Sequence, residues 1–118
     1  EGQSLPMAGV FPVSIDLSPK PQGLGYVEAT VDQDTPFFQK GRVLQGHEFH
    51  YSRAHAADGA ELTFALKLAR GEGILAGLDG LLYKQTFAAY THLHALGVPE
   101  WAHNFVAAAS HFQSRILL

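Results

Sequence analysis

Short apolar segments separated by turn residues constrain the fold of this chain more than any other feature of its sequence. Before residue 95, segments rich in Val, Ile, Phe and Tyr either alternate with polar residues or run continuously, which is the pattern of β-strands. Gly, Pro and Asp cluster between these segments, as turns require. We therefore expect strands over residues 8–16, 25–31, 42–52, 62–69, 74–76, 80–84 and 86–91.

The spacing of the apolar residues changes after the last expected strand. Pro99 suits the first turn of a helix, and Glu100 complements the positive end of a helix dipole. The apolar residues that follow lie three or four positions apart and predict one amphipathic helix: Trp101, Phe105, Ala108, Ala109 and Phe112. The predicted class is α/β, rich in strands and ending in this helix.

Two glycine-containing segments carry local predictions. Asp58-Gly59 lies between two expected strands and predicts a hairpin turn. The segment 71–77 reads Gly-Glu-Gly-Ile-Leu-Ala-Gly, which misses the dinucleotide-binding fingerprint by one residue and leads from one expected strand into another. We therefore interpret its glycines as turn residues.

The composition narrows the class of protein. Of the 118 residues, 47% are hydrophobic and 16% charged, which is typical of a packed globular domain and not of a disordered segment. The net charge is −3 and the eight Lys and Arg residues are scattered, so a nucleic-acid partner is not expected. No apolar stretch reaches the roughly 20 residues of a membrane span. The absence of Cys and of a signal pattern favours the cytoplasm.

The chain begins with Glu1 and enters an apolar segment by Leu5, so we expect it to be a piece of a longer protein. No repeat or long linker divides it, and residues 1–118 are treated as part of one domain.

Four of the seven histidines concentrate in two short segments. In the first, residues 46–52, strand geometry places Glu48 and His50 on one face and His47, Phe49 and Tyr51 on the other. The second, Tyr-Thr-His-Leu-His at residues 90–94, places His92 and His94 on one shared face. Polar side chains inside apolar strands must be paired when they are buried, which makes these histidines candidates for a functional site.

A metal site and a self-contained hydrolase are both disfavoured. Zinc would take His92, His94 and a residue of the first segment, but His47 and His50 lack the four-residue spacing of the helical H-E-x-x-H motif. We therefore assign no metal ligand. Nucleophilic catalysis would use His92 as general base toward a thiol, yet the chain has no Cys and no Gly-x-Ser-x-Gly elbow.

Several aromatic and histidine residues have a purely structural interpretation. Large aromatic side chains bury much apolar area, so we expect core or pocket-wall positions for Phe49, Tyr51, Tyr83, Phe87, Tyr90 and Trp101. The remaining histidines are expected to be partly exposed polar residues: His55, His103 and His111.

The segment 46–52, Gly-His-Glu-Phe-His-Tyr-Ser, resembles a motif of the cobyrinic acid a,c-diamide synthase family. Residues 7–12 and 22–29 resemble the family's segment downstream of its cysteine elbow. Residues 89–94, Ala-Tyr-Thr-His-Leu-His, resemble the stretch that carries the catalytic histidine of that family. The resemblance spans residues 5–112 and covers the later half of a class I glutamine amidotransferase domain.

This resemblance implies a division of labour between two domains. An ATP- and Mg-dependent amidoligase domain would use ammonia that the glutaminase domain releases from glutamine to amidate carboxylates of a tetrapyrrole. The cysteine elbow, the P-loop and the tetrapyrrole site would lie outside this chain, which would need no cofactor of its own and be inactive alone. His92 matches the general base and His94 a possible orienting residue. His47, Glu48, His50 and Tyr51 match motif residues near the pocket.

The resemblance leaves the substrate open between cobyrinic acid and sirohaem, because residues 90–97 resemble a branch that amidates sirohaem. The competing hypothesis is a non-catalytic ligand-binding or interaction module with a His-lined pocket. A half-domain also exposes apolar faces, so the isolated chain is expected to self-associate.

Overall fold

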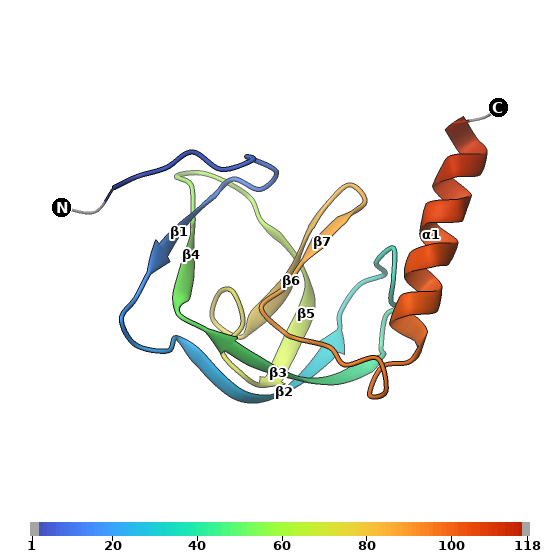
Figure 1. Ribbon diagram of the computed structural model, residues 1–118, viewed down its shortest axis with the longest axis horizontal. Coiled ribbons are helices and arrows are strands. Elements are labelled where there is room, and N and C mark those ends of the chain that lie inside the picture. The colour runs from blue at the N-terminus through green and yellow to red at the C-terminus, as the bar shows by residue number, and fades with distance from the viewer. Residues whose placement is uncertain (1–2, 117–118) are drawn as a thin grey trace.

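The computed structural model describes residues 3–116, which form two sheets and one helix (Figure 1). The expected α/β class, rich in strands and ending in a helix, is confirmed. The elements are β1 (Val13–Leu17), β2 (Gly23–Val31), β3 (Val43–His50), β4 (Ser52–Ala56), β5 (Thr63–Arg70), β6 (Leu78–Tyr83), β7 (Thr86–Ala88) and α1 (Glu100–Ile116).

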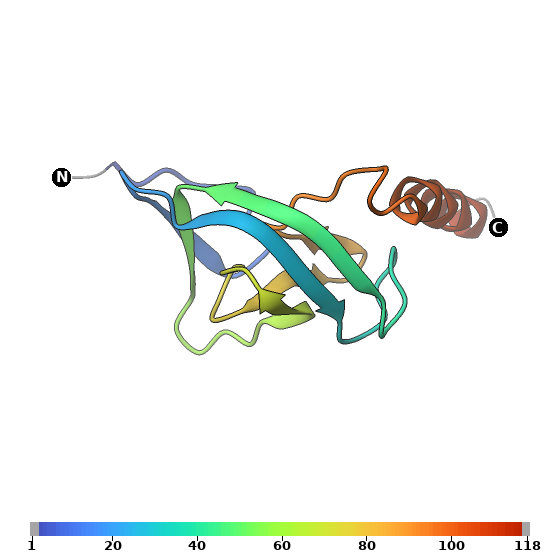
Figure 2. The same cartoon turned by 90° about the horizontal axis from the view of Figure 1, so that it is seen from below.

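The larger sheet has the strand order β3-β2-β5-β6-β7, and β1 pairs with β4 in a separate two-stranded sheet. Within residues 3–116 every strand pairing is antiparallel. Figure 2 shows β2 and β3 curving together across the molecule, in a register that runs from Gly23 opposite His50 to Thr30 opposite Val43. Because β3 is an edge strand, one of its sides is free to pair with a further segment.

The strand expected over residues 42–52 is divided at Tyr51. The part before it pairs with β2 and the part after it pairs with β1. Backbone hydrogen bonds fix the crossing, since the Ser18 N–H donates to the Tyr51 carbonyl at 2.7 Å and the Gln22 N–H to the His50 carbonyl at 2.8 Å. One run of sequence therefore serves two sheets.

The core lies on one face of the larger sheet. Alternate residues of β2 supply Val27, Ala29 and Val31, while Leu44 lies opposite Ala29 on β3. The complete buried cluster also includes residues of loops and of β5: Val27, Ala29, Val31, Phe38, Leu44, Leu66 and Val98. Burial on this face follows the period of two that strand geometry imposes.

The outer face of β2 and β3 contradicts part of the expected core. Phe49 points to this face with 53% of its surface exposed, and Tyr51, Tyr83 and Trp101 are also exposed. The expected core or pocket-wall position is therefore wrong as to the core for all four residues. Phe49 is exposed because no other helix or strand within residues 3–116 packs over the outer face of β2 and β3. Phe87 is partly buried against the core cluster, and Tyr90 is half-buried.

Local predictions at turns were less accurate. Residues 74–76 form a turn with one isolated bridge from Leu75 to Leu78, and no strand, since Ala76 and Gly77 have positive φ angles. Asp58-Gly59 does form a turn, but β4 and β5 belong to different sheets and make no hairpin. The first strand begins later than expected and the last strand ends earlier, at Val13 and Ala88.

The start of α1 is attached to the loop that precedes β3. Asn104 donates its side-chain N–H to the Phe37 carbonyl at 2.6 Å, and the Phe37 and Phe105 rings lie 5.7 Å apart. Arg42 and Glu100 form an ion pair at 2.5 Å, which lowers the pKa of Glu100. Figure 1 shows the rest of α1 standing clear of both sheets. Its length and hydropathy are insufficient to cross a membrane, and the same is true of any helix within residues 3–116.

Candidate active site

Strand β3 presents its motif residues to opposite faces, as predicted. The side chains of Glu48 and His50 are only 3% and 8% exposed, whereas His47 and Phe49 are exposed on the outer face. The sequence-derived alternation therefore separates the motif into an inner pair and an outer pair. Tyr51 is exposed at the break between the two sheets.

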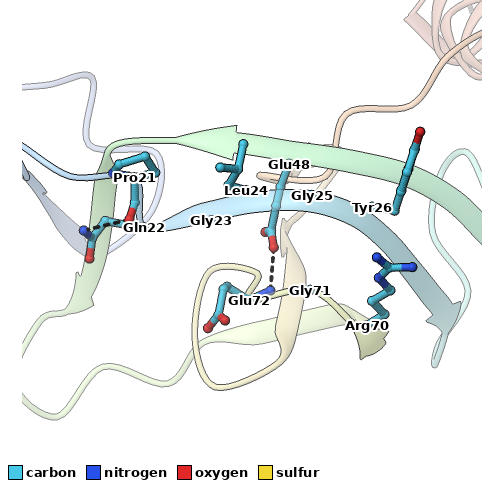
Figure 3. Close-up of a pocket in the computed structure, with 10 residues that line it drawn as sticks. All are labelled: Pro21, Gln22, Gly23, Leu24, Gly25, Tyr26, Glu48, Arg70, Gly71 and Glu72. Atoms are coloured by element: carbon cyan, nitrogen blue, oxygen red, sulfur yellow. Dashed lines mark hydrogen bonds between the residues drawn. The ribbon is translucent and has the colours of Figure 1, made fainter.

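The inner carboxylate of Glu48 is held by a glycine-rich turn. It accepts the backbone N–H of Glu72 at 2.6 Å and that of Gly73 at 3.1 Å. Gly71 and Gly73 have φ angles of 121° and 68°, a left-handed region in which a side chain is strained. Figure 3 shows Glu48 descending from β3 onto this turn. The turn glycines predicted from the sequence thus form a clamp for a buried charge.

His50 joins this clamp to the segment that carries the second histidine pair. Its Nδ1 donates to the Ser52 carbonyl at 2.9 Å, and its Nε2 lies 3.4 Å from Glu48 Oε2. The ring stacks on Tyr90, with centroids 3.7 Å apart and planes 3° from parallel. Tyr90 in turn shares a 2.7 Å hydrogen bond with the Ser52 hydroxyl. This polar network fixes the position of Tyr90 relative to β3.

His92 pairs with the free edge of β3. The His92 N–H donates to the His47 carbonyl at 2.7 Å, and the His47 N–H donates to the His92 carbonyl at 3.1 Å. Gly46 permits this approach, because a Cβ there would stand 2.4 Å from the His92 carbonyl oxygen. The His47 and His92 rings stack 4.9 Å apart. The structure therefore brings together His47 and His92, two predicted site residues that come from the two separate histidine segments of the sequence.

Asp79 is a further site residue, which lies between two of the strands expected from the sequence and was not among the predicted site residues. It is completely buried, and its carboxylate accepts the N–H groups of Tyr90 at 3.1 Å and Thr91 at 2.9 Å. The Thr91 hydroxyl donates to it at 2.6 Å. A sequence signal was present, since Asp79 interrupts a Leu-rich strand and a buried carboxylate requires partners.

His94 lies apart from this arrangement. Its side chain is exposed, and its Nδ1 accepts the Leu96 N–H at 3.2 Å within a turn. No hydrogen bond among the described residues links its ring to that of His92. The other three histidines are exposed, as expected: His55, His103 and His111.

Two open cavities adjoin Glu48 and His50. The first, of about 260 Å³, is lined by Glu48, Tyr26 and Arg70 among others, and the guanidinium of Arg70 lies 5.6 Å from the Tyr26 ring centroid (Figure 3). The second, of about 300 Å³, is lined by residues that include His50 and Tyr90. Neither is lined by His47, His92 or His94. Over residues 3–116, His, Asp and Glu side chains form no group of three that could hold a metal ion.

Comparison with known proteins identifies the family. The family model described as CobB/CobQ-like glutamine amidotransferase domain matches residues 1–99. The chain belongs to this family. The match ends just before α1, so the family region contains the complete network around Glu48, Asp79 and His92.

Curated relatives agree with the family assignment. The chain is 41% identical to proteins named cobyrinate a,c-diamide synthase from Methanosphaera stadtmanae and from Methanothermobacter thermautotrophicus, in both cases over 90% of this chain and 23% of the relative. A protein of the same name from Halobacterium salinarum is 39% identical over 80% of the chain and 21% of its own length. The chain thus spans about a quarter of the length of these relatives. No solved structure matches it.

Proposed function

We propose that this chain is the later part of the glutaminase domain of a glutamine-dependent, ATP-driven amidoligase, with His92 as its general base. In this mechanism His92 takes the proton from a cysteine thiol supplied by the preceding part of the parent protein. The thiolate attacks the glutamine amide, and the same proton then leaves with the departing ammonia. Without a cysteine, the isolated chain is inactive.

The observation that supports His92 is a fixed backbone with an exposed ring. Two hydrogen bonds to His47 hold the His92 backbone, and the two residues before it are bonded to buried Asp79. The His92 side chain remains exposed on the outer face of the sheet. A general base that must meet a thiol from another segment needs this combination of fixed position and accessible nitrogen. His94 is exposed two residues later, where it could orient the glutamine or the base.

The same outer face supports a contact with the rest of the glutaminase domain. Leu24 and Tyr26 lie opposite Phe49 and His47 in the β2–β3 register and are 69% and 73% exposed. Uncovered apolar sheet faces of this kind are typical of interaction surfaces. We expect the cysteine-bearing part of the domain to cover this face, and the isolated chain to self-associate through it. Sizing at increasing concentration would show dimers or larger species, whereas a constant monomer would contradict this expectation.

For the parent protein we propose amidation of tetrapyrrole carboxylates in the cytoplasm, and cobyrinic acid and sirohaem are both retained as substrates. The names of the relatives support the first of these. ATP and Mg do not fit this chain. It has no Gly-x-x-x-x-Gly-Lys-Ser/Thr sequence, and within residues 3–116 no acidic or histidine cluster could hold a metal ion. We therefore assign both to the amidoligase domain.

The alternative of a non-catalytic module with a His-lined pocket has less support. Of the four motif histidines, His50 alone lines either of the two cavities described above, and its ring is already engaged by Ser52, Glu48 and Tyr90. Two of the three exposed motif histidines, His47 and His92, stack on each other outside both cavities.

The decisive experiment uses the full-length parent with either glutamine or ammonium as nitrogen donor. His92→Ala should lower glutamine-driven amidation at least about 100-fold, because general base catalysis typically contributes this much. Ammonium-driven amidation should be unchanged, since it bypasses the glutaminase site. His111→Ala, which removes an exposed helical imidazole, serves as the matched control. Retention of glutamine-driven activity in His92→Ala would exclude this residue as the base.

A further inference from the structure

Asp79 is a charged side chain with no exposure to solvent and with every hydrogen bond directed at one short segment. It is the second residue of β6, in the sequence Leu-Asp-Gly-Leu-Leu. Its partners are the N–H of Tyr90 and the N–H and hydroxyl of Thr91. Burying a carboxylate is costly unless such bonds compensate for its lost hydration. A residue that served only to fill the core would be apolar at this position.

The segment that Asp79 holds lies between a strand and a helix, and Tyr90 within it also stacks on His50 and shares a hydrogen bond with Ser52. Strand β7 ends at Ala88, and α1 begins at Glu100. Among the described residues between these two elements, only His92 forms a β-bridge to a strand, through its two backbone hydrogen bonds with His47. Asp79 bonds the residue directly before His92 from the β6 side, while His47 pairs with His92 from the β3 side. The backbone of His92 is thereby fixed from two directions.

We propose that Asp79 is a positioning residue for His92 and acts through the backbone of Tyr90 and Thr91. This inference rests on the proposed role of His92 as general base. The carboxylate does not take the place of an acidic partner to the imidazole, because all of its hydrogen bonds go to the two preceding residues. Its effect is to set where the imidazole stands. A displacement of about 1 Å at a reacting group can cost on the order of 100-fold in rate.

The first test is structural and needs only this chain. Asp79→Asn puts an amide N–H₂ where the carboxylate accepts hydrogen bonds, so at least one of the three bonds is lost. Hydrogen exchange at the His92 and His47 amides should then accelerate at least about 10-fold, a loss of about 1.4 kcal/mol in local protection. Exchange at Leu44, in the β3–β2 pairing, should not change. Unchanged exchange at His92 would overturn the inference whatever His92 does in catalysis.

The second test measures catalysis in the full-length parent. Asp79→Asn should lower kcat for glutamine about 10- to 100-fold, leave KM for glutamine within about 2-fold, and spare ammonium-driven amidation. An equal loss of glutamine- and ammonium-driven rates would indicate general damage and overturn the inference. Full glutamine-driven activity in Asp79→Asn, beside an inactive His92→Ala, would overturn it as well. An active His92→Ala would instead contradict the proposed function. The hydrogen-exchange result would still show whether Asp79 fixes the backbone of His92.

Substitutions at Thr91 keep the question answerable if Asp79→Asn fails to fold. Thr91→Val removes only the hydroxyl that donates to Asp79 and preserves the shape of the side chain. It should lower kcat and protection at His92 in parallel, by less than Asp79→Asn. Thr91→Ser restores the hydroxyl and should recover both quantities. Equal behaviour of the Val and Ser variants would overturn the role assigned to this contact.

Discussion

The imidazole rings of His47 and His92 stack with their planes 12° from parallel, across two backbone hydrogen bonds that join the edge of β3 to the segment before α1. This contact connects the two histidine segments of the sequence. It also places the proposed general base on the outer face of the sheet, on the side opposite to the buried Glu48 carboxylate.

Gly46→Ala should break the pairing between β3 and His92. The added Cβ would stand 2.4 Å from the His92 carbonyl oxygen and 3.0 Å from the Thr91 methyl carbon, so the backbone must move apart. We expect a loss of about 1–3 kcal/mol in the free energy of unfolding, measured by urea denaturation. Gly97→Ala is the control, because a Cβ there meets its nearest atom at an ordinary 3.5 Å. Equal stability of the two variants would refute the steric argument.

Glu48→Gln should destabilise the glycine-rich turn. The substituted amide can offer an N–H group where the carboxylate accepts the N–H of Glu72 or Gly73. An unsatisfied buried donor costs about 1–3 kcal/mol, which urea denaturation would detect. Glu72→Gln removes the same charge from an exposed side chain and leaves both hydrogen bonds in place, so it should be nearly neutral. A destabilisation shared by both variants would point to net charge instead.

The Arg42–Glu100 ion pair should make the attachment of α1 depend on pH. The hydrogen bond that the Glu100 carboxylate accepts from Arg42 holds the pKa of Glu100 below the ordinary value of 4.5. The pair therefore stabilises the folded chain at pH above 4.5, and this contribution disappears as the pH falls through the lowered pKa. The difference in unfolding free energy between the wild type and Glu100→Gln should shrink toward zero on acidification.

The carboxyl titration of Glu100, followed by NMR, tests the same pair directly. Arg42→Gln should move the midpoint up toward 4.5, and added salt should do so partly in the wild type, because the pair is exposed. Arg53→Gln removes an equal charge from β4 and should leave the midpoint where it was. A Glu100 titration midpoint that is unchanged in Arg42→Gln would show that the Arg42–Glu100 contact is not formed in solution.

Local periodicity predicted the parts of the fold that depend on local geometry. The period of two assigned Glu48 and His50 to one face of β3 and His47 and Phe49 to the other, and the structure confirms it. The spacing of three or four positions between apolar residues also predicted α1. The chemical roles of His92 and His94 came from motif resemblance and stay predictions.

Other features could not be read locally because they depend on distant partners. The division at Tyr51 depends on β1 and β2, which come much earlier in the chain. Phe49 is exposed because no helix or strand within residues 3–116 packs over the outer face of the sheet. An aromatic residue in a strand ordinarily indicates a core position, so the sequence alone predicted burial. The partners of Asp79 are backbone groups, which no pattern of side chains reveals.

The clamp on Glu48 has a consequence for the order in which the chain folds. The carboxylate and the Glu72 N–H that it accepts are 24 residues apart in sequence, with β4 and β5 between them. Closing so long a loop lowers the chain entropy before the contact can stabilise the fold, which slows the formation of non-local sheets. We therefore expect the inner half of the histidine motif to reach its native geometry only after β5 has joined β2, because the turn that holds Glu48 directly follows β5.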